Sequence, residues 1–147
     1  MQAVELRSDT SRYVLFLENP TKIYEQRLEG SIRQRVDSQV NKFLTEVTPE
    51  SALQDAQKFP TPLRQLKDRG GKARALGTWC KGEGFDLFVV QILYDKDDED
   101  TYLPKKHVFA ERGEGYKDRF EAMSHEELQM KVQEWISKTD LLVFSHK

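Results

Sequence analysis

Residues 72–98, KARALGTWCKGEGFDLFVVQILYDKDD, carry the pattern that decides the fold. Within them, Phe85–Tyr94 contains only two polar residues in a run rich in β-forming side chains. Such a run predicts a central strand that is buried on both faces. Lys72–Cys80 is predicted to be its antiparallel partner, because Lys81–Gly84 supplies glycines that suit a tight turn. The stretch therefore predicts a β-hairpin inside a sheet.

The residues before this hairpin predict a strand followed by two helices. Residues 12–19, RYVLFLEN, form a short apolar run typical of a strand. Apolar side chains then recur every four positions from Tyr24 to Leu44, which predicts one amphipathic helix of about six or seven turns. Gly30, in its middle, is expected to mark a kink or a close contact. Thr48-Pro49 gives a cap followed by proline and predicts a second helix over residues 50–59.

The residues around and after the hairpin predict loops, one more strand and a final helix. Residues 60–71 and 95–104 are expected to be loops, and Lys105–Arg112 a strand that ends at Gly113 and Gly115. One or two helical turns are expected at 116–123. Ser124 and Glu127 form a capping box at the start of a helix. Its apolar face would comprise Leu128, Val132, Trp135 and Ile136, and residues 140–147 are interpreted as a last strand.

These elements predict a single α+β domain over residues 1–147. An N-terminal strand and a helical hairpin would pack on an antiparallel sheet, with an extra C-terminal helix. The 147 residues suffice for one core, and 10% aromatic content argues against disorder. No apolar run approaches the ~20 residues of a membrane span. The N-terminus lacks the apolar core of a signal peptide, and Cys80 has no partner cysteine, so we expect a soluble cytoplasmic protein.

Basic residues gather in the segment that leads into the hairpin. Residues 64–81 have a net charge of +5 and residues 105–119 a net charge of +2, in a chain whose net charge is −2. If both segments belong to one sheet, their charges form a patch that attracts phosphates or an acidic partner. The alternative interpretation is that these cations are simply solvated at loops and strand ends.

In its layout, the chain resembles the RelE/ParE toxin superfamily. The resemblance rests on the first strand, the helical hairpin, the basic connector PLRQLKD, the strand KARALGTW and the strand GFDLFVVQILYDKDD. The turn-like stretch HVFAERGEGYKDRF stands where the family has its C-terminal basic and aromatic positions. The similarity covers residues 12–123, and residues 124–147 form an addition to it.

This resemblance implies a toxin-like protein of a toxin–antitoxin pair, with RNA, the ribosome and an antitoxin as partners and no membrane partner. Family nucleases work without a metal or cofactor and let the RNA 2′-hydroxyl attack the adjacent phosphate. The candidate catalytic residues are Lys72, Arg74, Arg112 and Tyr116, with Phe120 replacing Tyr116 in another register. The candidate nucleic-acid-binding residues are Arg64, Lys67, Arg69, Lys81, Lys105 and Lys106.

Two other functions stay open at this point. Asp86 stands where the nucleases usually carry an arginine, which favours binding over cleavage. The main alternative is therefore a non-catalytic protein-binding domain on the same scaffold, and another is self-association through the long helix. The three histidines, His107, His125 and His146, share no metal-ligand spacing, so no zinc site is expected.

Overall fold

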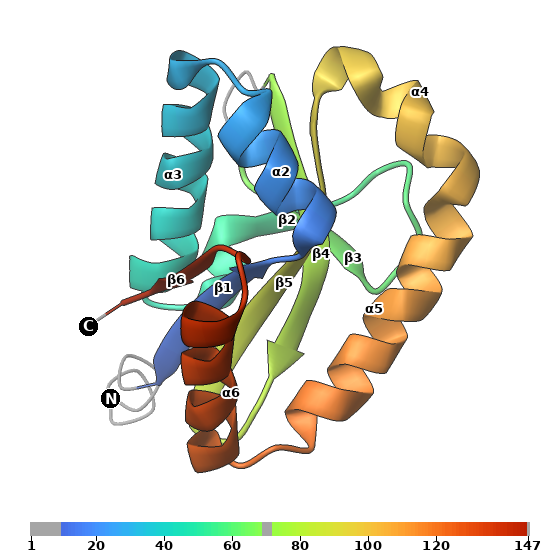
Figure 1. Cartoon of the computed structure of the whole chain (residues 1–147). Helices are drawn as coiled ribbons and strands as arrows, with labels where there is room; N and C mark the ends of the chain where they lie inside the picture. Colours follow the sequence, from blue (N-terminus) through green and yellow to red (C-terminus); the bar gives the residue numbers. More distant parts are fainter. Residues whose placement is uncertain (1–9, 69–71, 147) are drawn as a thin grey trace.

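A six-stranded sheet with the strand order β2-β3-β4-β5-β1-β6 organises the molecule. The structure is a computed structural model that describes residues 10–68 and 72–146 (Figure 1). The strands are β1 (Ser11–Phe16), β2 (Leu53–Asp55), β3 (Leu63–Leu66), β4 (Ala73–Lys81), β5 (Phe85–Asp95) and β6 (Val143–Ser145). The helices are α2 (Glu18–Gln26), α3 (Gly30–Thr45), α4 (Glu99–Tyr102), α5 (Lys106–Glu121) and α6 (His125–Lys138). The predicted α+β class is confirmed.

The predicted hairpin is present as β4 and β5, the two longest strands. They pair antiparallel from Ala73 opposite Asp95 to Lys81 opposite Asp86. Gly84 has a φ of 86° in the connecting turn, a conformation that glycine adopts without steric cost. Every residue of Phe85–Tyr94 is buried, because helices pack on both faces of β5 and β1 pairs parallel with it on its other edge. The hairpin is therefore the centre of the sheet.

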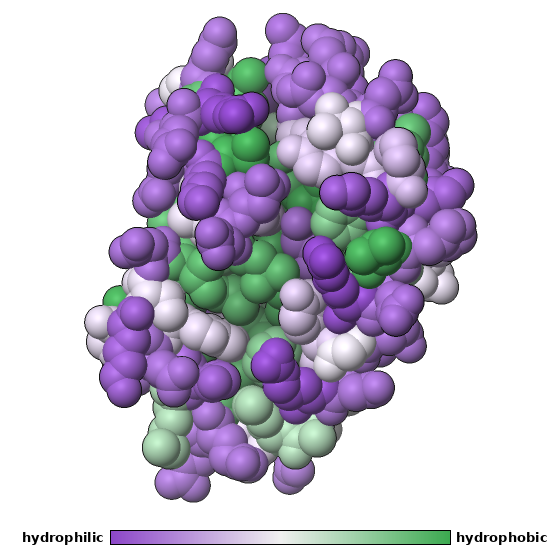
Figure 2. All heavy atoms as spheres, turned by 45° about the vertical axis from the view of Figure 1, so that its right-hand side comes forward, coloured by the Kyte–Doolittle hydropathy of each residue, from purple (hydrophilic) through white to green (hydrophobic). Residues whose placement is uncertain are grey.

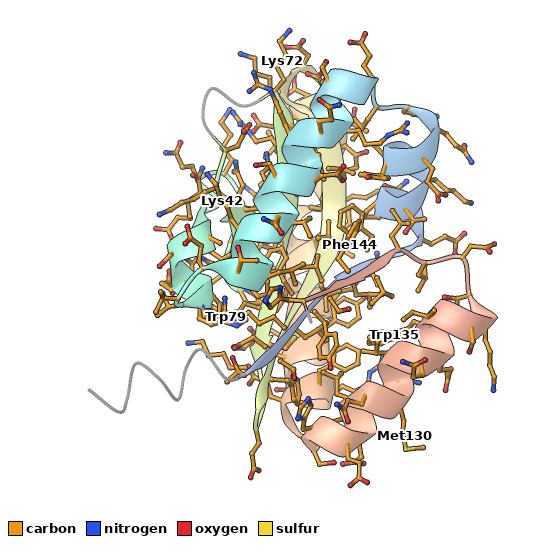
Figure 3. The ribbon with its side chains drawn as sticks, turned by 90° about the vertical axis from the view of Figure 1, so that its left-hand side faces the viewer. Lys42, Lys72, Trp79, Met130, Trp135 and Phe144 are labelled. Carbon is orange, nitrogen blue, oxygen red and sulfur yellow. The ribbon has the colours of Figure 1, made fainter. Side chains whose placement is uncertain are left out.

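Helices cover both faces of this sheet (Figure 1). Side chains alternate along β1, so Val14 and Phe16 join the core under α2 and α3, whereas Tyr13 and Leu15 join the core under α6. Figure 3 shows α3 lying along the sheet, with Lys72 and Trp79 toward its opposite ends. The α4–α5 side is mostly hydrophilic, with hydrophobic residues visible near its centre (Figure 2).

The prediction of one long N-terminal helix was wrong. The chain forms α2 and α3, which a turn at residues 27–29 separates, and Gly30 begins α3. The break lets Leu28 enter the core beside residues of both helices. The hydroxyl of Tyr24 on α2 donates a hydrogen bond to Asp37 on α3 and ties the pair together. α2 and α3 form the helical layer on the sheet. The predicted layer consisted of one helix over Tyr24–Leu44 and a second over residues 50–59.

The helix predicted over residues 50–59 is also absent. A short 3-10 helix, η1 (Pro49–Ala52), leads into β2 instead. Leu53, Ala56 and Phe59 have helical spacing, yet Leu53 packs in the core under α3 and the other two pack on the opposite face of the sheet. One helix cannot supply both faces, and an extended edge strand can. The predicted loop 60–71 likewise contains β3.

The strand predicted at Lys105–Arg112 is a helix. α5 runs through this segment and continues past Gly113 and Gly115 to Glu121. The predicted loop 95–104 is partly helical and contains α4. Because α5 packs on the sheet rather than within it, the cations of residues 105–119 do not belong to the sheet. The two basic segments, residues 64–81 and 105–119, therefore do not share one sheet, as the predicted patch requires.

The C-terminal region follows its prediction. Ser124 and Glu127 make both hydrogen bonds of the capping box at the start of α6, and β6 pairs antiparallel with β1. Leu128, Val132 and Trp135 are buried as expected, whereas Ile136 is 55% exposed. None of the helices in the described ranges is long and apolar enough to cross a bilayer.

Candidate nucleic-acid interface

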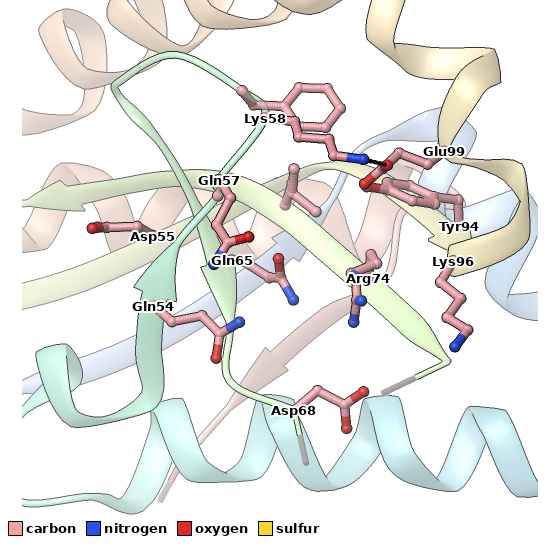
Figure 4. Close-up of a pocket in the computed structure, with 13 residues that line it drawn as sticks. Gln54, Asp55, Gln57, Lys58, Gln65, Asp68, Arg74, Tyr94, Lys96 and Glu99 are labelled. Carbon is pink, nitrogen blue, oxygen red and sulfur yellow. Dashed lines mark hydrogen bonds and ion pairs between the residues drawn. The ribbon is translucent and has the colours of Figure 1, made fainter. Parts of the chain in front are cut away.

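A polar hollow of about 630 Å³ opens on the sheet face that carries α4 and α5. It lies over β2 to β5, between the loop of residues 56–59 and the start of α4 (Figure 4). Its lining residues are Gln54, Asp55, Ala56, Gln57, Lys58, Phe59, Gln65, Asp68, Arg74, Leu76, Tyr94, Lys96 and Glu99. A hollow of this size accommodates a ligand about as large as one nucleotide.

Adjacent strands supply the floor of the hollow. Gln54 of β2 pairs opposite Gln65 of β3, and Arg74 of β4 pairs opposite Tyr94 of β5. Opposite residues of an antiparallel pair point to the same face of a sheet, so the two amides, the guanidinium and the phenol share one surface. Gln65 is 6% exposed and Arg74 is half-buried. Neighbouring backbones thus fix where these polar groups stand.

One wall of the hollow is held by Glu99 of α4. Lys58 forms an ion pair with Glu99 at 2.7 Å, and the Tyr94 hydroxyl donates to the same carboxylate at 3.4 Å. The Tyr94 ring stacks on Tyr102 with 5.1 Å between ring centroids. Burial, and then the charge of Glu99, raise the pKa of Tyr94 above its usual value. Tyr94 therefore remains a protonated hydrogen-bond donor at neutral pH.

The charges around the hollow balance. Three cationic and three anionic side chains line it, namely Lys58, Arg74, Lys96, Asp55, Asp68 and Glu99. Asp55 lies at the margin, where its carboxylate is 3.6 Å from Arg64 Nε and points away from the floor in Figure 4. The Oδ2 atom of Asp68 is buried and has no hydrogen-bond partner among the described residues. Because this oxygen is enclosed, a ligand in the hollow reaches it only if the Asp68 side chain moves.

The four predicted catalytic residues do not form one cluster. Arg74 lines the hollow, and Lys72 is exposed just before β4, where it lines a separate depression beside Tyr102. Arg112 is exposed on α5. Tyr116 packs against the apolar cluster that contains Cys80. Cys80 lies six residues along β4 from Arg74, which corresponds to about 20 Å on a strand. Phe120 is buried in that same cluster.

The predicted nucleic-acid-binding residues are also spread over the surface. Arg64 pairs with Glu50 at 2.6 Å, and Lys81 stacks over the Trp79 ring at 4.2 Å. Lys67 is exposed beside Asp68 and lines a small depression with Lys42. Lys105 is exposed and Lys106 half-buried at the start of α5. Arg69 lies outside the described residues.

Sequence reasoning missed most of the hollow. Gln54 and Gln57 stood on the polar side of a predicted helix, and Gln65 and Asp68 in a predicted loop, so nothing placed them beside Arg74. Residues 63–66, LRQL, do not alternate between apolar and polar side chains, so no local pattern marked β3 as a strand. Within residues 10–68 and 72–146, no three His, Cys, Asp or Glu side chains are arranged to hold a metal ion.

Comparisons with protein-family models, with curated proteins and with solved structures returned no match.

Proposed function

We propose that this protein binds single-stranded RNA, with one unstacked base entering the hollow over β2 to β5, as the RNA-binding toxin-like component of a RelE/ParE-type pair. The observation that carries the proposal is the convergence of Arg74, Gln54 and Gln65 on one open hollow of nucleotide size. Guanidinium and amide groups match the hydrogen-bonding edges of bases. Neighbouring strands position all three groups, which limits the ordering cost of binding.

The shape of the site favours single-stranded over double-stranded RNA. Duplex RNA is recognised mainly through its phosphates and 2′-hydroxyls, and its paired bases stay stacked inside the helix. A hollow that takes one base requires that base to leave its stack, which costs least in a single strand. Lysines at the rim can hold the flanking phosphates as the strand passes over. They are Lys58 and Lys96, both exposed.

The proposal concerns binding, and cleavage is not part of it. In-line attack by a 2′-hydroxyl needs a base, an acid and cations around one phosphate. Arg74 lies near the start of β4, whereas Tyr116 of α5 packs against the cluster that contains Cys80, near the other end of that strand, so the two cannot surround one phosphate in this conformation. The family-like part of the proposal rests on the resemblance in the sequence.

Binding of a fluorescently labelled single-stranded RNA tests the proposal. Log affinity should fall with log salt between about 50 and 200 mM, as phosphate contacts require. Arg74→Ala should weaken binding by about tenfold or more, because it removes a guanidinium contact to the base. Lys22→Ala is the matched control: Lys22 is exposed on α2, where it pairs with Glu18, so its loss should change affinity less than twofold.

Two results would overturn the proposal. One is an absence of RNA affinity at low salt in the wild-type protein. The other is an equal, small effect of Arg74→Ala and Lys22→Ala, which would mean that the hollow does not contact the RNA. In either case the protein-binding alternative would take its place.

A further inference from the structure

We infer that the protein forms a twofold symmetric dimer through the outer edge of β6, so that the sheets of two copies join into one. The inference is independent of the proposed RNA binding, and it uses a surface other than the long helix considered above for self-association. In the described part of the chain, β6 is the last strand of the sheet and pairs with β1 alone. Figure 3 shows β6 passing in front of β1, between α3 and α6.

The backbone of β6 directs hydrogen-bonding groups away from the sheet. The β1–β6 register places Leu142 opposite Phe16, whose N–H donates to the Leu142 carbonyl at 2.9 Å. Hydrogen-bonded and non-hydrogen-bonded pairs alternate along an antiparallel ladder. Val143, the next residue, therefore turns its N–H and C=O toward the outer edge, and Ser145 does the same two residues further on. Such outward groups are a template for a further strand.

The side chains of β6 do not protect this edge. Residues 141–145, LLVFS, contain neither a charge nor a proline, two features that commonly keep an edge strand from pairing. β2, at the opposite edge of the sheet, ends in Asp55, whose side chain is 94% exposed. The two edges of the sheet therefore differ, because a charge marks the β2 edge and the β6 edge is apolar.

Apolar side chains of this segment are only half-buried, on both faces of the sheet. Leu142 and Phe144 pack at the margin of the core under α2 and α3. Leu141 and Val143 pack at the margin of the core under α6. An added strand would cover part of what remains exposed, because side chains opposite each other on paired strands are in contact. The edge thus offers apolar surface as well as hydrogen bonds.

A second copy of β6 fits this edge because the segment is complementary to itself. A twofold axis pairs two identical strands antiparallel, so each contact occurs twice. With the axis at Val143, the two Val143 residues exchange N–H···O bonds, and Leu142 lies opposite Phe144 of the second copy. The same register brings Asp140 opposite His146 of the second copy at both ends, and both side chains are exposed. An imidazole N–H can donate to a carboxylate, so the ends of the paired strands match as well.

Sedimentation equilibrium of the full chain between about 5 and 500 µM tests the inference, because five residues on each side make a small interface of micromolar affinity. The mass should rise from monomer to dimer over this range. Ser145→Lys places a charge at the outer edge and should weaken association by about tenfold or more. Gln129→Lys is the matched control: it adds the same charge at an exposed position near the start of α6 and should change association less than about twofold. Thermal melting checks that both variants keep the fold.

An exchange of the terminal charges tests the register. Asp140→Lys would place a lysine opposite His146 of the second copy, and His146→Glu would place two carboxylates opposite each other. Each change should weaken association by about threefold or more, because the contact occurs twice. The double variant restores opposite charges at both ends and should return the dissociation constant to within about twofold of wild type. Such a recovery reports contact between the two positions, since a local change of fold in either single variant would persist in the double variant.

Three results would overturn the inference. One is a wild-type protein that stays monomeric over the whole range. Another is a dimer that Ser145→Lys and Gln129→Lys affect equally, which would place the interface elsewhere. The third is dimerisation only after residues 1–9 are removed, which would assign the edge to the N-terminal segment of the same chain. None of these results depends on RNA, because the hollow lies over β2 to β5 and β1 separates those strands from β6.

Discussion

The indole Nε1 of Trp79 donates a 2.9 Å hydrogen bond to Oδ1 of Asp86 across the β4–β5 hairpin. Thr10 Oγ1 donates to the other carboxylate oxygen at 3.2 Å, and Asp86 is 1% exposed. Arg12, opposite Asp86 in the parallel register, donates to backbone carbonyls at the end of α3. Asp86 is therefore an internal polar anchor on the α3 face, and not a surface charge that faces RNA.

The buried position of Asp86 changes the result that we expect from Asp86→Arg. If Asp86 took the place of a phosphate-binding arginine, the substitution would strengthen RNA binding. Because the carboxylate is buried, we expect the substitution to lower the free energy of unfolding by about 3 kcal/mol or more. Urea denaturation measures the loss. Glu83→Arg, at the exposed turn of the same hairpin, is the control and should change stability by about 0.5 kcal/mol or less.

The sequence predicted the elements whose side chains follow one dominant period. β5 is buried on both faces, so its apolar run was unambiguous, and the capping box at Ser124 is a local signal. Residues 50–59 were misread because Leu53, Ala56 and Phe59 serve two cores on opposite faces. No local pattern records which core a residue joins. The hollow was invisible for the same reason, since its polar residues come from strands that pair only in three dimensions.

A buried site on α3 tests the packing of the helical layer. Val36 is 0% exposed in the core beneath α3, so Val36→Asp should destabilise the protein by about 3–5 kcal/mol through an unpaired buried charge. Val47→Asp introduces the same charge just beyond α3, where the side chain is 57% exposed. It should have little effect in the same urea titration. Equal midpoints for both variants would contradict the packing of α3 and favour the self-association alternative.

Two glycines in α5 should respond in opposite directions. A Cβ at Gly113 would collide with Thr78 Oγ1 and press on Pro62, so Gly113→Ala should cost about 1–3 kcal/mol as α5 shifts from β4. A Cβ at Gly115 meets open space. Gly115→Ala should therefore stabilise the helix by about 1 kcal/mol. Thermal melting of the pair distinguishes a helix that continues through these glycines from the strand end that the sequence predicts there, because a strand end gives no reason for this opposition.

The lone cysteine should be chemically silent in the folded protein. Cys80 is 0% exposed, and burial raises the pKa of its thiol to about 12, with the charge of Glu121 adding to the effect. The thiolate is the reactive form, so iodoacetamide at about pH 8 should modify native protein far more slowly than protein in urea. Because the chain has one cysteine, the mass shift reports this site alone. Equal rates in both conditions would mean that the β4–β5 end of the sheet opens readily.

The α5 surface provides the sharpest functional contrast with the hollow. Gly113 of α5 lies against Thr78, four residues along β4 from Arg74, which corresponds to about 13 Å on a strand. Arg112 is exposed next to this contact, and Tyr116 packs inward. Arg112→Ala and Tyr116→Phe should therefore leave the affinity for single-stranded RNA within about twofold of wild type, whereas Arg74→Ala lowers it by about tenfold. Fluorescence anisotropy with one RNA and one salt concentration compares the three variants directly. A loss in Arg112→Ala as large as that in Arg74→Ala would move the RNA path onto α5, because a side chain outside the hollow weakens binding that strongly only if it touches a phosphate or a base itself.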